Sequence, residues 1–264
     1  MPTPLPAPEP AYAALTAVGR VRQHNEDAIL CCPRFRLWAL ADGMGGHRCG
    51  EVASALALKT LQSLVRRGDD LVGAIHATHA AILAEAERDA SQHGMGTTLV
   101  AVRLDGAEFE LAWVGDSRGY RVGSSRIEQL THDHSWVQMM VDAGQLSGEQ
   151  ARSHPRRNVL TQCLGGPGQA LEVGRVCGRL DYGELLLLCS DGLTGELSDV
   201  QIQQCCAAAA TLDDMVGELV EAANRRGGKD NISCIVLGLS APPPVAMEAR
   251  PRSFLDKLLK PAKS

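Results

Sequence analysis

Short apolar runs and longer amphipathic segments follow one another along this chain. Five apolar runs have the length and composition of buried β-strands: residues 37–41, 98–104, 109–114, 185–189 and 232–239. Two long helices are predicted in direct succession after the first run. Residues 51–65 are rich in Ala and Leu, and apolar residues recur at helical spacing from Leu71 to Ala86.

A second pair of helices is predicted near the C-terminus. Ser198 and Gln201 have the spacing of a capping box, which predicts a helix through Ala209. Thr211 can cap the next helix, which ends at the glycine pair 227–228. Strands therefore neighbour strands and helices neighbour helices, as is typical of sheets covered by helix pairs and not of a doubly wound sheet. We predict a layered α+β sandwich.

Aspartates stand at one end of four predicted strands: Asp42, Asp116, Asp191 and Asp230. If these ends lie side by side, the carboxylates cannot all ionise without a compensating cation. Oxygen ligands alone favour Mg2+ or Mn2+ over zinc. Gly43 would let the backbone bend so that its carbonyl joins the ligands. Asp-Gly is also a common turn dipeptide, so the spacing leaves open that these residues are only polar turns.

Composition narrows the range of partners. The 264 residues carry 26 Lys and Arg against 31 Asp and Glu, and a net charge of −5 argues against nucleic-acid binding. No apolar run is long enough to span a membrane, and residues 1–10 are Pro-rich and unlike a signal peptide, so we expect a cytoplasmic protein. Nine cysteines without a C-x-x-C pair are typical of reduced, structural thiols.

Six short motifs, taken in order, resemble the bacterial form of the metal-dependent type 2C (PPM family) Ser/Thr protein phosphatases. They are GRVRQHNED at 19–27, ADGMGGH at 41–47, GTT at 96–98, GDSR at 115–118, SDG at 190–192 and KDN at 229–231. The resemblance extends from residue 12 to about 240. It implies a four-layer α-β-β-α sandwich, with two central antiparallel sheets flanked by helix pairs, which agrees with the element order. We predict a Pro-rich tail at 1–10, the phosphatase domain at 11–240 and a second tail at 241–264.

The resemblance also implies a metal centre with two Mn2+ or Mg2+ ions. Asp42 would bridge the ions, the Gly43 carbonyl would bind one of them, and Asp191 and Asp230 would complete the other. The all-oxygen ligand set does not decide between the two metals.

Further residues match the surroundings of that centre. Glu26 and Asp27 would act directly or through metal-bound water, and Asp116 matches the aspartate that can bind a third ion together with Asp191. Arg22 stands where the family has its phosphate-binding arginine, and a planar guanidinium suits two phosphate oxygens at once.

The implied reaction is hydrolysis of phosphoserine or phosphothreonine in proteins by a hydroxide that bridges the two ions. Phosphoprotein substrates and a cognate Ser/Thr kinase would be its partners. Met44 replaces the histidine that eukaryotic members offer as a general acid. His47 is one candidate for that role, and a metal-bound water is another.

The segment 131–166 resembles the family's flap. Arg156 and Arg157 within it would read residues around the phosphate, or else face solvent. Residues 241–264 are Pro-rich and then basic and amphipathic, and docking of a partner by this tail is a hypothesis. Two alternative functions are a catalytically silent adaptor that binds phosphoproteins or a kinase, and a phosphatase for small phosphomonoesters.

Overall fold

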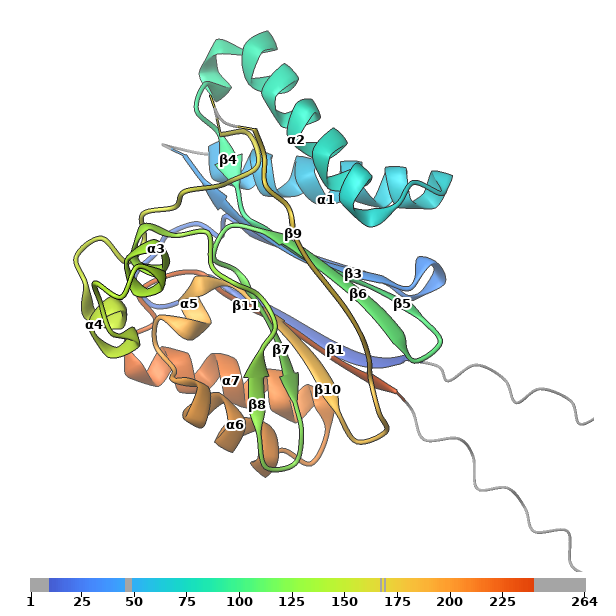
Figure 1. The fold of residues 1–264 in the computed structure, drawn as a ribbon, viewed down its shortest axis with the longest axis vertical. Coiled ribbons are helices and arrows are strands. Elements are labelled where there is room, and N and C mark those ends of the chain that lie inside the picture. Colours follow the sequence, from blue (N-terminus) through green and yellow to red (C-terminus); the bar gives the residue numbers. More distant parts are fainter. Residues whose placement is uncertain (1–9, 46–48, 167, 169, 240–264) are drawn as a thin grey trace, which may run out of the picture.

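The computed structural model describes residues 10–45, 49–166, 168 and 170–239, and it places two antiparallel sheets face to face (Figure 1). The five-stranded sheet has the order β1 (Pro10–Ala17), β11 (Ile232–Leu239), β10 (Leu185–Cys189), β7 (Arg118–Val122) and β8 (Ile127–Gln129). The six-stranded sheet has the order β2 (Asp27–Cys32), β3 (Leu37–Met44), β5 (Leu99–Asp105), β6 (Glu108–Val114) and β9 (Gly174–Arg179), with the short β4 (Gly96–Thr97) paired to β3.

A pair of long helices covers the outer face of each sheet (Figure 1). The six-stranded sheet carries α1 (Cys49–Arg67) and α2 (Leu71–Arg88), and the five-stranded sheet carries α6 (Asp199–Ala208) and α7 (Leu212–Arg226). The shorter helices are α3 (Trp136–Asp142), α4 (Gly148–Ser153), α5 (Asp191–Thr194) and the 3-10 turns η1 (Pro33–Phe35) and η2 (Ala90–Gln92). The predicted α+β sandwich with four layers is therefore confirmed. Among the described helices, none combines the length and apolar character needed to cross a bilayer.

Three apolar clusters fill the spaces between the four layers. Alternate residues of β3 belong to two different clusters. Leu37 and Ala39 face α1 and α2, whereas Trp38 and Leu40 face the other sheet. Central strands covered on both faces must be apolar at every position, which is why β3, β10 and β11 are readily predicted as continuous apolar runs. The third cluster lies between the five-stranded sheet and α6 and α7.

The predicted strands 185–189 and 232–239 have their observed bounds, and Ser198 and Thr211 cap the helices that follow them. In the segment predicted as a flap, α3 begins at Trp136, because Ser135 caps its N-terminus. One placement was wrong. Pairing with β4 extends β3 to Met44, so Asp42 lies inside a strand and not after it.

The prediction missed β1, β2, β7, β8, β9 and the two-residue β4. Four of these, β1, β2, β8 and β9, are the outermost strands of the two sheets. An outer strand has one unpaired edge and a partly exposed face, as in β9, where half-buried and exposed positions alternate. The sequences of β8 (IEQ) and β9 (GRVCGR) lack the continuous apolar run by which the central strands were recognised, whereas β1 (PAYAALTA) and β2 (DAILCC) are largely apolar and were overlooked.

Candidate active site

Acidic side chains from both sheets meet at one end of the sandwich. Asp42 on β3 lies directly opposite Asp27 on β2. From the other sheet, Asp191 begins α5 directly after β10, and Asp230 stands just before β11. Asp116 lies in the turn between β6 and β7. The structure thus brings together the five aspartates that the sequence singled out.

Close backbone approaches hold Asp42 in place. The carbonyl of Asp42 accepts hydrogen bonds from the Thr98 N–H at 2.8 Å and the Thr97 hydroxyl at 2.9 Å, so the GTT motif binds the backbone of this strand. Gly43 donates its N–H to the Glu26 carbonyl at 3.1 Å. A side chain at Gly43 would collide with the backbone carbonyls of Gly50 and Glu26, which explains the glycine.

Burial and mutual repulsion make full ionisation of this cluster unfavourable. Burial first, and then the charges of Asp27 and Asp191, raises the pKa of Asp42 well above its usual range. Burial and the charge of Asp191 likewise raise the pKa of Asp116. Burial and the charge of Asp230 raise the pKa of Asp191 to about 6, although a hydrogen bond to Asp42 lowers it. Near neutral pH the site must therefore take up protons or cations.

Asp27 is buried, with only 9% of its surface exposed. Its Oδ2 accepts hydrogen bonds from the hydroxyls of Ser190 at 2.8 Å and Ser233 at 2.6 Å. Burial raises its pKa to about 7, although these two hydroxyls lower it. Its Oδ1 is buried without a hydrogen-bond partner among the described residues. An unpartnered carboxylate oxygen opposite Asp42 fits a bound cation or a water held by one.

Arg22 and Glu26 reach the cluster on a loop that Asn231 holds. The Asn231 side chain donates to the carbonyls of Val18 at 2.9 Å and His24 at 2.8 Å, and it accepts the Glu26 N–H at 2.8 Å. No role was predicted for Asn231 beyond its place in the KDN motif. Its position directly after Asp230 and before a fully buried strand is the signal that could have found it, because a polar residue there needs partners.

The Arg22 guanidinium pairs with a ligand candidate and faces solvent. It donates to the carboxylate of Asp230 at 2.7 Å, and 49% of its side chain is exposed. Burial raises the pKa of the Glu26 carboxyl, although the charge of Arg22 lowers it. Arg22 is thus both anchored beside the acidic cluster and accessible to an incoming anion.

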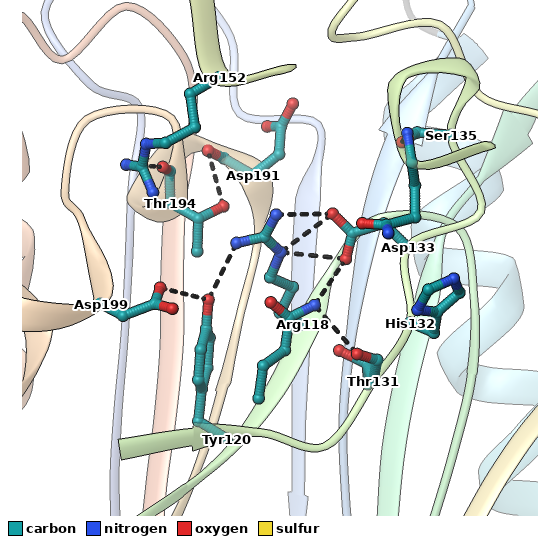
Figure 2. A network of polar contacts seen from close by, with 12 residues as sticks. Arg118, Tyr120, Thr131, His132, Asp133, Ser135, Arg152, Asp191, Thr194 and Asp199 are labelled. Carbon is teal, nitrogen blue, oxygen red and sulfur yellow. Dashed lines mark hydrogen bonds and ion pairs between the residues drawn. The ribbon is translucent and has the colours of Figure 1, made fainter. Parts of the chain in front are cut away.

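The segment predicted as a flap is tied to the five-stranded sheet at its first residues (Figure 2). Arg118 on β7 donates to both carboxylate oxygens of Asp133, with the shortest bond at 2.7 Å, and to the Tyr120 hydroxyl at 3.1 Å. The Tyr120 hydroxyl in turn donates to Asp199, the first residue of α6, at 3.2 Å. With 21% of the Arg118 side chain and 9% of the Asp133 side chain exposed, this is a largely buried ion pair.

A second contact ties the flap to the helix that carries Asp191. Arg152 on α4 donates to the backbone carbonyls of Thr194 at 3.3 Å and Leu197 at 3.0 Å, so α4 lies against the end of α5 (Figure 2). A cavity of about 330 Å³ between these elements is lined by Asp116, Asp191 and Arg157, among other residues. The flap segment therefore borders the acidic cluster.

The two flap arginines differ in their surroundings. Arg157 lines the cavity beside Asp191, and its charge lowers the pKa of that aspartate. Arg156 stacks over the ring of Trp136 at 5.1 Å. The structure thus places Arg157, and not Arg156, where it could contact a ligand of the acidic site.

His47, the candidate general acid, lies outside the described residues. Within the described part of the chain, no group of three His, Cys, Asp or Glu side chains is arranged so that it could hold a metal ion as it stands. The carboxylates are gathered, mutually repelling and only partly hydrogen-bonded, which is the chemistry of a site that closes around a hard cation.

The fold consists of two antiparallel sheets between helix pairs. Its site is an acidic cluster that needs a cation, with an arginine beside it. Together they define the class of α-β-β-α domains with a metal-dependent site. The comparison with known families agrees. The family profile described as Protein phosphatase 2C matches residues 19–236. This chain belongs to the protein phosphatase 2C family.

Characterised relatives lie well within the range of clear homology. The chain is 38% identical over 231 residues to the serine/threonine protein phosphatase PstP of Mycobacterium tuberculosis, covering 85% of this chain and 44% of that protein's length. It is 35% identical over 232 residues to the serine/threonine phosphatase stp of Listeria innocua, covering 83% of this chain and 92% of the relative. A crystal structure of the PstP catalytic domain in complex with two manganese ions superposes with a TM-score of 0.79 at 36% identity, covering 88% and 99% of the two chains.

Proposed function

We propose that this chain hydrolyses phosphoserine and phosphothreonine in proteins with the help of Mn2+ or Mg2+. The observation that carries the proposal is the cluster of Asp27, Asp42, Asp116 and Asp191, in which burial raises every pKa and a cation is needed for full ionisation. The solvent-accessible guanidinium of Arg22 beside that cluster supports binding of a phosphate. Family membership and the activities printed for PstP and stp support the same reaction.

Asp42, Asp191, Asp230 and the carbonyl of Gly43 would hold two ions. Glu26 and Asp27 would act on them directly or through water, and Asp116 with Asp191 would hold a third. When bound, such ions lower the pKa of a coordinated water toward neutrality and act as Lewis acids on phosphate oxygens. The two manganese ions in the related PstP structure support this assignment.

Other side chains of this protein would bind and orient the substrate. Arg22 would share its guanidinium between Asp230 and the phosphate, offsetting repulsion between the substrate and the carboxylates. Arg157 would meet the part of the substrate that enters the cavity under the flap. No described side chain is assigned as the general acid, and His47 and a bound water stay as the two candidates.

The partners proposed on this basis are phosphorylated proteins and a Ser/Thr kinase whose action the enzyme reverses. We also retain residues 11–240 as the phosphatase domain and a cytoplasmic location as proposals. The C-terminal residues 241–264, for which docking was a hypothesis, lie outside the described residues.

The test is phosphate release from a phosphothreonine peptide by protein stripped with chelator and titrated with Mn2+ and then Mg2+. Release that depends on metal and is lost in Asp42→Asn is expected. Release from p-nitrophenyl phosphate but from no phosphopeptide would instead favour a small-molecule phosphomonoesterase. Binding of a phosphopeptide without release at any metal concentration, by folded protein, would favour the adaptor.

A further inference from the structure

A closed ring of hydrogen bonds surrounds Asp27 and joins the two sheets. The Asn25 side-chain amide donates to the Thr16 hydroxyl at 2.8 Å, which lies 2.7 Å from the Ser233 hydroxyl. Ser233 donates to Oδ2 of Asp27 at 2.6 Å, and the Asp27 N–H donates back to the Asn25 side-chain oxygen at 3.2 Å. Thr16 and Ser233 face each other on β1 and β11, whereas Asp27 begins β2 in the other sheet (Figure 1).

The direction of every hydrogen in this ring is determined. A hydroxyl has one hydrogen to donate, and Ser233 gives its own to Asp27, so Thr16 must donate to Ser233. Ser190 closes the other side of the same oxygen, because its hydroxyl donates to Oδ2 of Asp27 at 2.8 Å and accepts the Ser233 N–H at 3.0 Å. Oδ2 is therefore a pure acceptor of two hydroxyl hydrogens.

The other oxygen of Asp27, Oδ1, is left free to contact a bound ion or its water. Oδ1 is buried and has no partner among the described residues, and Asp27 lies directly opposite Asp42. The ligand candidates come from both sheets, with Asp42 on β3 and Asp191 and Asp230 next to β10 and β11. The relative position of these ligand candidates depends on how the two sheets meet at this end of the sandwich. The ring of hydrogen bonds is a polar connection between the sheets at that end.

We propose that Thr16, Ser190 and Ser233 are positioning residues for the metal centre. They hold Oδ2 of Asp27 so that Oδ1 faces the bound ions or their water, and they set the spacing between ligands of the two sheets. The inference rests on the proposed function, since it assumes that metal binds at this cluster. Partners of this kind that hold a ligating carboxylate typically change metal affinity by about ten- to hundredfold when they are removed.

The test is Mn2+ affinity of the full chain, measured by isothermal titration calorimetry on protein stripped with chelator. Ser233→Ala removes a hydroxyl from Asp27 and should weaken binding about ten- to hundredfold. Thr16→Val removes the next hydroxyl outward at a half-buried position and should weaken it less. Ser233→Thr keeps the hydroxyl and should restore most of the affinity. Thr78→Val is the matched control, because Thr78 is a fully buried hydroxyl on α2 that bonds only its own helix.

Graded loss in Ser233→Ala and Thr16→Val, with the control unchanged, would support the inference. The inference would be overturned if Thr16→Val binds Mn2+ as tightly as wild type and Ser233→Ala is weakened no more than the control. The proposed function would remain intact. If Ser233→Ala fails to fold, Thr16→Val keeps the test decisive. Wild-type Mn2+ affinity in Thr16→Val would then count against a positioning role for the hydrogen-bonded ring. Wild-type protein that binds no Mn2+ would refute the proposed function and this inference together.

Discussion

Asp191→Asn should have opposite effects on stability with and without metal. In metal-free protein, burial and the charge of Asp230 raise the pKa of Asp191 from its ordinary value of 3.8 to about 6. A carboxyl whose pKa is higher in the folded than in the unfolded state makes folding less favourable as pH rises from about 4 through 6. At pH 8 the folded protein therefore bears the whole cost of this charge, and an asparagine removes it.

The magnitude follows from the pKa difference. At about 1.4 kcal/mol per pH unit, the rise from 3.8 to about 6 corresponds to roughly 3 kcal/mol. Screening at this half-buried position reduces the expected gain to about 2 kcal/mol. With Mn2+ at about a hundred times its dissociation constant, wild-type protein gains about 2.7 kcal/mol, and the variant without this ligand gains little. The order of stabilities should therefore reverse.

The assay is urea unfolding followed by tryptophan fluorescence at pH 8, once with chelator and once with Mn2+. In chelator the advantage of Asp191→Asn should shrink as pH falls toward 4, where the aspartate is protonated. Asp69→Asn, an exposed carboxylate between α1 and α2, is the control and should differ from wild type by less than about 0.5 kcal/mol throughout. Wild type more stable than Asp191→Asn in chelator at pH 8, or an equal gain of both from Mn2+, would refute the reasoning.

Three further predictions concern the surroundings of the site. Arg22→Ala should lower kcat/KM for a phosphopeptide about ten- to hundredfold through the lost charged hydrogen bonds, and unchanged steady-state kinetics would exclude Arg22 from phosphate binding. Arg118→Met leaves the largely buried Asp133 carboxylate without its cation and with only the Gln129 amide as a side-chain donor, and should cost about 3 kcal/mol in urea unfolding; a loss under 1 kcal/mol would mean that water replaces the guanidinium. Gly192→Ala drives a methyl group into the Asn231 carbonyl, so the unfolding midpoint should fall by the equivalent of about 2 kcal/mol, and an unshifted midpoint would show that α5 can move away.

Several parts of this molecule could be predicted from local sequence. Residues 185–189 and 232–239 are apolar throughout because both faces of β10 and β11 are covered, and such runs are visible without any knowledge of their partners. The caps at Ser198 and Thr211 act within three residues of the helices they begin. The edge strand β9 escaped prediction, because its open side leaves polar residues among the apolar ones.

The sequence by itself determined the central strands β3, β5, β6, β10 and β11, the two helix pairs and with them the layered fold, along with the set of aspartates that the fold gathers. Only the tertiary structure decided which atoms face one another. Ser233 and Asp27 are 206 positions apart, and their hydrogen bond exists because two sheets pack at one end with a particular register. Hydroxyls such as those of Thr16 and Ser233 carry no local signal, since their role depends on partners that only packing supplies.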